Sequence, residues 1–329
     1  MKLLLLTLVL IGLRWPASAQ SYGVTDLGDI FPVAINNAGQ VIGGDILWEN
    51  GKVTHLGRLV NSTRATALNN RGQIVGTSGS GMFSAMEERN VRAFVWQNGR
   101  MRDLGSQQTG SQYYATGIND MGQVIGTSYR HPLLWQNGHR TYLPKLIKDP
   151  PYTLFFCETA GINNRGQSVG YSQNSNGETR AVLWQNGHIL DLGGVGGHDA
   201  KAVAINDQGQ IVGYASTYLS QHRHAFLWQN GRSFDLKTLP GDTNSQAASI
   251  NSTGEIVGTS GDVGKNQSPR AFSWHNGKMK DLSAFVLSAG WRLQYASGIN
   301  DRGQIVGTGL HHGHKRAFLL TPKSENKPK

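Results

Sequence analysis

Short apolar runs of four or five residues follow one another along the chain after residue 20, and Gly, Asn or Asp interrupts each of them. A helix needs apolar positions three and four residues apart over a longer stretch, so this pattern predicts strands. The segment 202–236 shows it best, with runs at 202–206, 210–214, 224–228 and 232–236. We interpret these runs as four consecutive strands, a to d.

Two connections in this segment are tight turns. Asn206-Asp-Gln-Gly209 lies between strands a and b, and Asn230-Gly231 lies between strands c and d. Asn-Gly between apolar runs favours a hairpin because both residues accept positive φ. The same Trp-x-Asn-Gly sequence occurs six times, with its tryptophan at Trp48, Trp96, Trp135, Trp184, Trp228 and Trp274.

The a–b turn belongs to a phrase that returns seven times: a small residue, Ile or Leu, Asn, two variable residues, Gly, and Gln or Glu. Its asparagines are Asn36, Asn69, Asn119, Asn163, Asn206, Asn251 and Asn300. A period of roughly 45 residues indicates a repeat array. The phrase occurs seven times but the Trp-x-Asn-Gly turn only six times, because the last unit ends after its strand c, at 316–320.

An isolated d-type strand at 22–28 supplies the element that the last unit lacks, since its Asp26-Leu27-Gly28 matches Asp103-Leu-Gly105 and Asp191-Leu-Gly193. Pairing the two ends would close the array and remove its exposed edges. We therefore predict an all-β fold, a seven-bladed β-propeller of four-stranded antiparallel blades, with the last blade closed by the N-terminal strand. The small residue of each phrase suits a crowded innermost strand a, and the tryptophans should lie between blades.

Residues 1–19 have the features of a secretory signal peptide, because Lys2 precedes an apolar run at 3–13 and Ala17-Ser18-Ala19 forms a cleavage site. The run is shorter than the roughly 20 residues of a spanning helix, and an uncleaved anchor is the alternative. We expect cleavage after Ala19, a secreted or periplasmic product, and no membrane span after cleavage. The propeller domain is predicted at 20–321, followed by a disordered basic tail at 322–329.

The chain carries a formal net charge of +10, and loss of Lys2 and Arg14 with the leader would leave +8 (10 − 2). This excess favours anionic partners without specifying one, and a solvated surface without a specific partner is the alternative. Cys157 is the single cysteine, so an intramolecular disulfide is excluded, and we expect a buried, unreactive thiol. No sequence motif of a cofactor or metal enzyme is present, and we expect no cofactor.

Strand c begins with Arg92-Ala-Phe94, Arg270-Ala-Phe272, Arg316-Ala-Phe318 and His224-Ala-Phe226 in four units. With the Trp-x-Asn-Gly turn and the Asp-Leu strand, these sequences resemble the bacterial extracellular HAF-repeat family over nearly the whole mature chain. The resemblance implies the repeat fold and export, and it offers no catalytic residues to transfer. Some members end in a Pro-Glu-Pro sorting signal with a membrane helix, whereas this chain ends in Lys-Pro-Lys.

In such blades the a–b and c–d turns share one face, and the b–c and d–a connections share the other. The second set varies between units, and variable loops on a rigid fold commonly carry binding. Aromatic and basic residues lie there outside the repeat pattern and suit stacking with anion contacts, although packing of their own loops is the alternative. Our candidate ligand-binding residues are Tyr113, Tyr114, Tyr152, Tyr218, Trp291, Arg292, His222, His311, His312 and His314.

The same face carries further candidates for chemistry. Three histidines would hold zinc or copper only if they converged on one point. Two carboxylates could make an acid–base pair only at a suitable separation. The carboxylates concerned are Glu87, Glu88, Asp149, Glu158, Glu178, Asp199, Asp242 and Asp262. Asp120, Asp207 and Asp301 of the a–b turns are interpreted as turn formers without chemistry.

Two functions remain open from the sequence. The first is a monomeric secreted or periplasmic binding scaffold that engages an anionic polysaccharide, a cell-surface glycan or a protein through the variable face. The second is a hydrolase or lyase acting on a polymer, with histidines and carboxylates of the same face. Nucleic-acid recognition is a poor third because the basic residues form no stripe along the sequence and the leader exports the chain.

Overall fold

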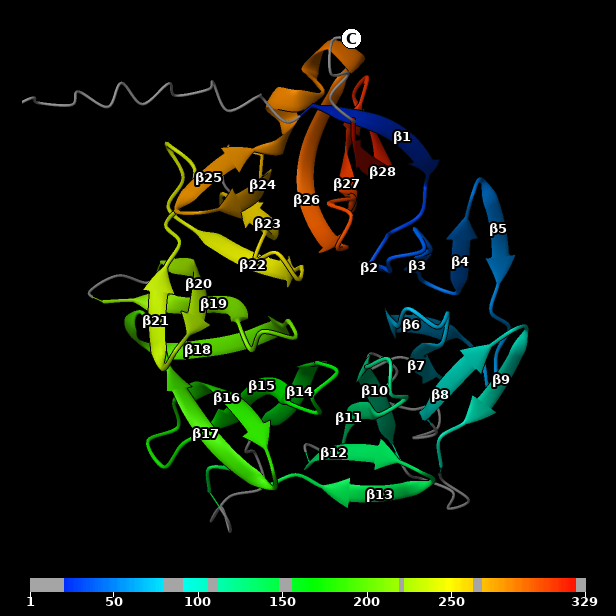
Figure 1. Cartoon of the computed structure of the whole chain (residues 1–329), viewed down its shortest axis with the longest axis vertical. Coiled ribbons are helices and arrows are strands. Elements are labelled where there is room, and N and C mark those ends of the chain that lie inside the picture. Colours follow the sequence, from blue (N-terminus) through cyan, green and yellow to red (C-terminus); the bar gives the residue numbers. More distant parts are fainter. Residues whose placement is uncertain are drawn as a thin grey trace, which may run out of the picture.

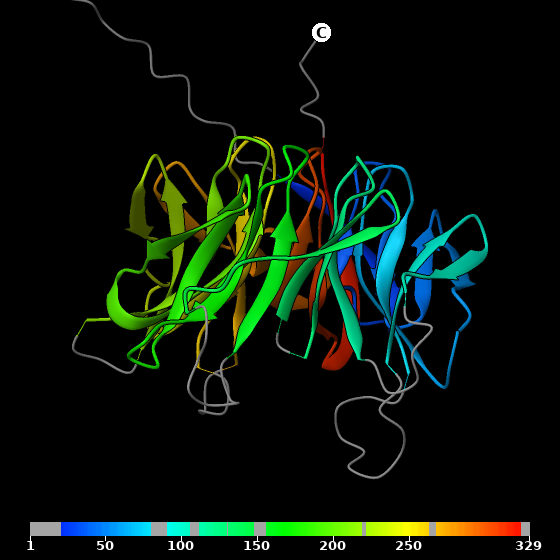
Figure 2. The same cartoon turned by 90° about the horizontal axis from the view of Figure 1, so that it is seen from below.

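The computed structural model describes residues 21–79, 91–105, 112–129, 131–147, 156–218, 222–262 and 268–323. These residues form seven four-stranded antiparallel sheets around a central axis (Figure 1). The chain is a seven-bladed β-propeller, as the repeat count predicts. Seen from the side, the strands run between two faces of a flattened ring (Figure 2).

Blades 1 to 6 each use four consecutive strands in the order a to d, with strand a nearest the axis (Figure 1). Blades 1 and 2 contain β2 (Ala34–Ile35), β3 (Val41–Gly43), β4 (Ile46–Glu49), β5 (Lys52–His55), β6 (Thr63–Leu68), β7 (Ile74–Ser78), β8 (Arg92–Gln97) and β9 (Arg100–Asp103). Blades 3 and 4 contain β10 (Tyr113–Ile118), β11 (Val124–Ser128), β12 (His131–Gln136), β13 (His139–Tyr142), β14 (Cys157–Ile162), β15 (Ser168–Gln173), β16 (Thr179–Gln185) and β17 (His188–Gly193). Blades 5 and 6 contain β18 (Gly196–Ile205), β19 (Ile211–Thr217), β20 (Arg223–Gln229), β21 (Arg232–Asp235), β22 (Ser245–Ile250), β23 (Ile256–Ser260), β24 (Arg270–His275) and β25 (Lys278–Asp281).

Blade 7 joins the two ends of the chain. Its strands β26 (Trp291–Ile299), β27 (Ile305–His311) and β28 (His314–Pro322) are completed by β1 (Tyr22–Gly28). β1 pairs antiparallel with β28, so that Tyr22 lies opposite Pro322 and Asp26 opposite Phe318. The predicted closure by the N-terminal strand is therefore confirmed.

A glycine on strand b allows the close approach of strand a in blades 2 to 7, and Gly43 allows that of the connection before strand a in blade 1. Strand a carries a β-bulge in most blades, for example between Ala115 and Gly117 of blade 3. A Cβ placed on Gly126 of the neighbouring strand would collide with the carbonyl oxygen of Tyr114. The glycine of the recurring Val-Gly or Ile-Gly pair is thus required by packing between two strands.

The core lies mainly between neighbouring blades. The phenylalanines of the Arg/His-Ala-Phe sequences, Phe94, Phe226, Phe272 and Phe318, are fully buried. Trp96 of blade 2 packs with Ile42 and Leu47 of blade 1. Trp135 of blade 3 packs likewise against blade 2. The predicted place of these tryptophans between blades is confirmed.

Other predictions have mixed outcomes. Cys157 is buried, and burial raises the pKa of its thiol to about 11, as expected for an unreactive cysteine. Two 3₁₀ turns, η1 (Leu282–Phe285) and η2 (Leu287–Ala289), lie where the sequence pattern indicated only a loop.

The predicted leader at 1–19 and most of the tail at 322–329 lie outside the described residues. Within the described ranges, no helix is long and apolar enough to cross a membrane.

Candidate functional site

The two faces of the ring differ in their connections, as predicted. We call the face with the a–b and c–d turns the turn face, and the face with the b–c and d–a connections the connection face. In five blades an ion pair recurs at the connection face, because a cation near the start of strand c meets an aspartate near the end of strand d. The pairs are Arg92–Asp103, Arg180–Asp191, His224–Asp235, Arg270–Asp281 and, across the ring closure, Arg316–Asp26.

A hollow of about 340 Å³ opens on the connection face where blade 7 meets blade 1. Blade 7 has long strands, nine residues in β26, whereas β2 of blade 1 has two and β3 has three. The difference in strand length leaves a step between the blades. The hollow is lined by Asp29, Ile30, Phe31, Gln294, Tyr295, Thr308, Gly309, Lys315 and Arg316.

Two aromatic rings of this hollow face solvent. Phe31 is 72% exposed, and Tyr295 is 38% exposed. Phe31 lies in the connection from β1 to β2, and Tyr295 lies on β26, so segments from opposite ends of the chain form one wall. An exposed phenylalanine beside a half-exposed tyrosine is a stacking surface that the fold itself does not use.

The two cations of the hollow, Arg316 and Lys315, differ in their partners. The Arg316 guanidinium donates hydrogen bonds to Asp26 at 3.1 Å and to Asp29 at 2.9 Å. Burial opposes ionisation of Asp26, but hydrogen bonds from the Gly28 N–H, Arg316 and His311 lower its pKa below the usual range. Lys315 is exposed and forms no ion pair with any described carboxylate. Lys315 is therefore the cation available to an anionic ligand.

Trp291, His311 and His312 come together in blade 7, and His311 shares Asp26 with Arg316 of the hollow. Trp291 is only 3% exposed, and its ring stacks on that of His311 with 4.5 Å between centroids. The His312 ring lies 4.5 Å from His311 in a tilted arrangement. His311 Nδ1 is 3.2 Å from Asp26 Oδ2. Trp291 thus belongs to strand β26 and the core, which is the packing alternative that the sequence left open.

The other candidate residues are distributed over separate blades. Tyr113 of blade 3 accepts a hydrogen bond from Arg140 at 2.6 Å, and the half-buried Tyr114 follows it on β10. Tyr218 and His222 flank the b–c connection of blade 5, where Tyr218 is 73% exposed. Arg292 and His314 are exposed in blade 7. Tyr152, Glu87, Glu88 and Asp149 lie outside the described residues.

The described carboxylates of the connection face have structural partners. Glu178 meets His198 at 2.6 Å, and Asp242 meets Arg270 at 2.8 Å. Asp199 accepts the Thr179 N–H, and Asp262 accepts from Thr243. Among the residues that the structure describes, no three His, Cys, Asp or Glu side chains are grouped as a metal ion would require.

Glu158 stands in a different setting, between blades 4 and 5. Burial and then the neighbouring Glu158 carboxylate raise the pKa of Tyr171. The Lys201 ammonium lies 3.8 Å from the Tyr171 ring centre, and burial lowers its pKa. Arg223 lies over the Tyr214 ring at 5.7 Å. Each cation here thus has an aromatic partner, Lys201 the Tyr171 ring and Arg223 the Tyr214 ring.

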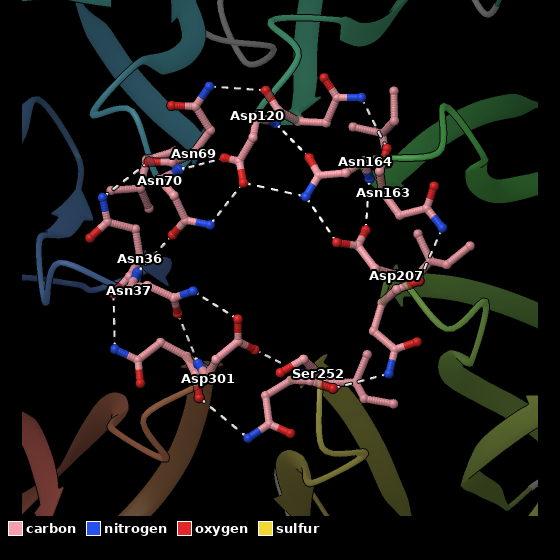
Figure 3. A pocket seen from close by; sticks show the side chains of 18 of the residues that line it. Asn36, Asn37, Asn69, Asn70, Asp120, Asn163, Asn164, Asp207, Ser252 and Asp301 are labelled. Atoms are coloured by element: carbon pink, nitrogen blue, oxygen red, sulfur yellow. Dashed lines mark hydrogen bonds between the residues drawn. The ribbon is translucent and has the colours of Figure 1, made fainter.

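A second hollow, of about 240 Å³, lies on the axis at the turn face (Figure 3). The repeated asparagine of each blade donates its side-chain amide to the backbone carbonyl of the asparagine in the next blade. The bonds run from Asn36 to Asn69, Asn119, Asn163, Asn206, Asn251, Asn300 and back to Asn36. The ring is thus closed by seven bonds between blades.

The side chains of the residues that follow these asparagines point toward the axis and form an inner ring around the hollow, as Asn70, Asp120 and Asn164 show (Figure 3). Asp120 accepts from the Asn70 N–H at 2.7 Å, and Asp301 accepts from the Ser252 N–H at 2.8 Å. Asp207 likewise accepts from Asn164. The three aspartates form turns as predicted, but each also binds the turn of a neighbouring blade. This second role was not foreseen.

No protein-family model matches the chain, and no curated protein matches it. Among solved structures, the β-propeller domain of the Trilobed protease from Pyrococcus furiosus is similar, with TM-score 0.54 and 10% identity over 94% of this chain and 98% of that one. The extracellular domain of a putative hybrid two-component system from B. thetaiotaomicron gives TM-score 0.52 and 10% identity over 92% of this chain. A puromycin-hydrolyzing peptidase from Mycobacterium tuberculosis gives 0.51 and 11% over 85%.

These similarities establish the propeller fold. This chain spans 40% of that extracellular domain and 49% of the peptidase. The Pyrococcus propeller has an open velcro topology, whereas here β1 closes the last sheet. The resemblance to the HAF-repeat family stays a prediction.

Sequence reasoning missed Phe31, Tyr295, Lys315 and Arg316 as residues of one hollow. Phe31 lies in the connection that follows the closing strand, which was not included among the variable segments. Tyr295 occupies the strand-a position held by Tyr114, Glu158 and Lys201 in other blades. Comparing the residue at this strand-a position between units would have singled out Tyr295 as a candidate.

Proposed function

We propose that this protein is a binding protein that holds a carbohydrate with an acidic substituent in the hollow between blades 7 and 1. The observation that carries the proposal is the pair of solvent-facing rings, Phe31 and Tyr295, beside Lys315, which forms no ion pair with the described carboxylates. Rings take the apolar face of a sugar, while Gln294 and Thr308 offer hydrogen bonds to its hydroxyl groups. A secreted or periplasmic location, implied by the leader, belongs to the same proposal.

The hydrolase alternative has less support from the same residues. A glycosidase of the usual kind needs one carboxylic acid with a raised pKa and a second carboxylate nearby. Asp29 and Asp26 are both bound to Arg316, and the pKa of Asp26 is lowered. The hollow thus contains bound carboxylates, which suit ligand orientation better than proton transfer.

Calorimetric titration of the protein with glucuronate oligosaccharides and with neutral glucose oligosaccharides tests the proposal. We expect binding of the acidic series, a loss of about tenfold in affinity for Tyr295→Ala or Phe31→Ala, and a similar loss for Lys315→Gln. Phe234→Ala is the matched control because Phe234 is 46% exposed on the outer strand β21 of blade 5. Equal affinities for parent and hollow variants, or no binding of any saccharide, would contradict the assignment.

A further inference from the structure

A basic residue follows every Asn-Gly turn between strands c and d. These residues are Lys52, Arg100, His139, His188, Arg232 and Lys278, and each begins the outermost strand of its blade. All six are exposed. Blade 7 has no such turn, but Lys323 extends from the end of β28 at the same level, where its N–H binds the Ser21 carbonyl. We call these seven residues the basic rim.

The basic rim lies on the turn face, and its charges are not neutralised there. None of the seven forms an ion pair with a described carboxylate, although Lys52 lies opposite Glu49 in the strand register. On the connection face, by contrast, a cation near the start of strand c is paired with an aspartate in five of the seven blades. The two faces therefore differ in available charge.

The other charges of the turn face lie inside the rim. Arg71, Arg165 and Arg302 are exposed in the a–b turns. Asp120, Asp207 and Asp301 are occupied by amides around the axis, and burial raises the pKa of Glu255. Glu49, exposed at the end of β4 and bound by the Gln40 amide, is the carboxylate that faces the rim, opposite Lys52. The other rim residues begin their strands opposite Gln97, Gln136, Gln185, Gln229 and His275, so the outer circle carries an excess of positive charge.

The arrangement in a circle selects the kind of partner. A linear polyanion follows a stripe of cations and would meet only one arc of the rim at a time. The a–b and c–d turns are short and alike in nearly every blade, and their tips all lie on the same side of the ring (Figure 2). A flat anionic surface can meet all parts of such a rim together.

We infer that the turn face docks on a bilayer of anionic lipids through the basic rim. Attraction of each Lys or Arg to an anionic bilayer multiplies the partition coefficient by about fivefold, and salt screens the effect. Binding is peripheral, so it requires no spanning segment. The hollow between blades 7 and 1 then faces away from the membrane.

Sedimentation of the full protein with vesicles tests the inference. We expect binding to vesicles of phosphatidylcholine with about one third phosphatidylglycerol, little binding to pure phosphatidylcholine, and release by salt. The variant Lys52→Gln/Arg100→Gln/Arg232→Gln/Lys278→Gln should lose binding at a factor of about five per cation. The matched control is Arg58→Gln/Arg64→Gln/Arg223→Gln/Lys237→Gln, which removes four exposed cations from the connection face.

The outcomes distinguish vesicle binding through the turn face from vesicle binding that depends only on the total charge of the protein. Loss in the rim variant with retention in the control supports docking through the turn face. Equal loss in both variants would assign the effect to total charge and overturn the inference. Binding to heparin without binding to anionic vesicles would overturn it in favour of a soluble polyanion.

Discussion

At the scale of single residues, Asn119 combines two roles. Its side-chain oxygen accepts the N–H groups of Met121 and Gln123 and so forms the a–b turn. Its side-chain nitrogen donates to Gln123 at 2.6 Å and to the Asn163 carbonyl of the next blade at 3.0 Å. Since Asn119 is 4% exposed, any group left without its partner has no water to replace it.

The chain contains a natural comparison for this residue. Asn174, in the b–c turn of blade 4, makes the same turn bonds to Asn176 and Glu178. Among the described contacts, it makes no bond to a neighbouring blade. The difference between the two asparagines is therefore burial and the bond between blades.

We expect Asn119→Ala to lower the free energy of unfolding by about 2–4 kcal/mol, because it removes four bonds at a buried position. Asn174→Ala should cost about 1 kcal/mol, since water can replace its turn bonds. Urea unfolding of both variants measures the difference. Equal costs would show that the turn alone, without the link to the next blade, explains the repeated asparagine.

At the scale of elements, β1 is the strand whose pairing connects the two ends of the ring. Asp26 binds Arg316 of β28 in the same way that Asp191 of β17 binds Arg180 of β16. Each aspartate also accepts the N–H of the glycine two residues later. The geometry is alike, but Asp26 joins segments 290 residues apart, and Asp191 joins neighbours in one hairpin.

We expect Asp26→Ala to loosen β1 from β28, whereas Asp191→Ala should disturb only its own blade. Hydrogen exchange of the β28 amides is the measurement. Faster exchange across 317–322 in the first variant, with little change there in the second, is the expected result. Unchanged protection in both variants would show that backbone pairing and the burial of Tyr22 and Leu27 suffice to hold the strand.

Lowering the pH should weaken the same contact between Asp26 of β1 and Arg316 of β28. Because the pKa of Asp26 is lowered in the folded protein, its stabilising effect is complete above the unfolded value of about 3.9 and is lost as the pH falls through the lower, folded value. We expect β28 exchange to quicken below about pH 4 in the parent protein. Asp26→Asn should show fast exchange at neutral pH and a smaller change on acidification.

The sequence predicted the blades well because turn chemistry and strand period are local properties. Asn-Gly, the repeated asparagine and the orphan strand at 22–28 sufficed to count and close the ring. The candidate site could not be predicted in the same way. Its hollow depends on the unequal lengths of strands in blades 7 and 1. Trp291, which looked like a loop residue, begins strand β26, and the His311 ring stacks on it.

At the scale of the whole molecule, the two proposals use opposite faces. The hollow with Phe31, Tyr295 and Lys315 opens on the connection face, and the basic rim lies on the turn face. The ring between them is held by contacts between successive blades, and the described residues suggest no route by which one face would distort the other.

We therefore expect saccharide and vesicle binding to be independent. Protein bound to anionic vesicles should keep the saccharide affinity of free protein within about twofold, since no coupling free energy links the sites. Lys315→Gln should leave vesicle binding intact, and the rim variant should leave saccharide affinity intact. Mutual exclusion would place both ligands on one face.

The closure by β1 also sets an order in time. A ribosome releases a chain from its N-terminus, so the strand at 22–28 emerges before the other strands of the ring, whereas its partner at 317–322 emerges after them. Six blades can assemble while this first strand waits without a partner. Until β28 is synthesised, β1 has no partner and the array of blades keeps unpaired strand edges. The first strand of the ring to be synthesised is therefore the strand that completes the last blade.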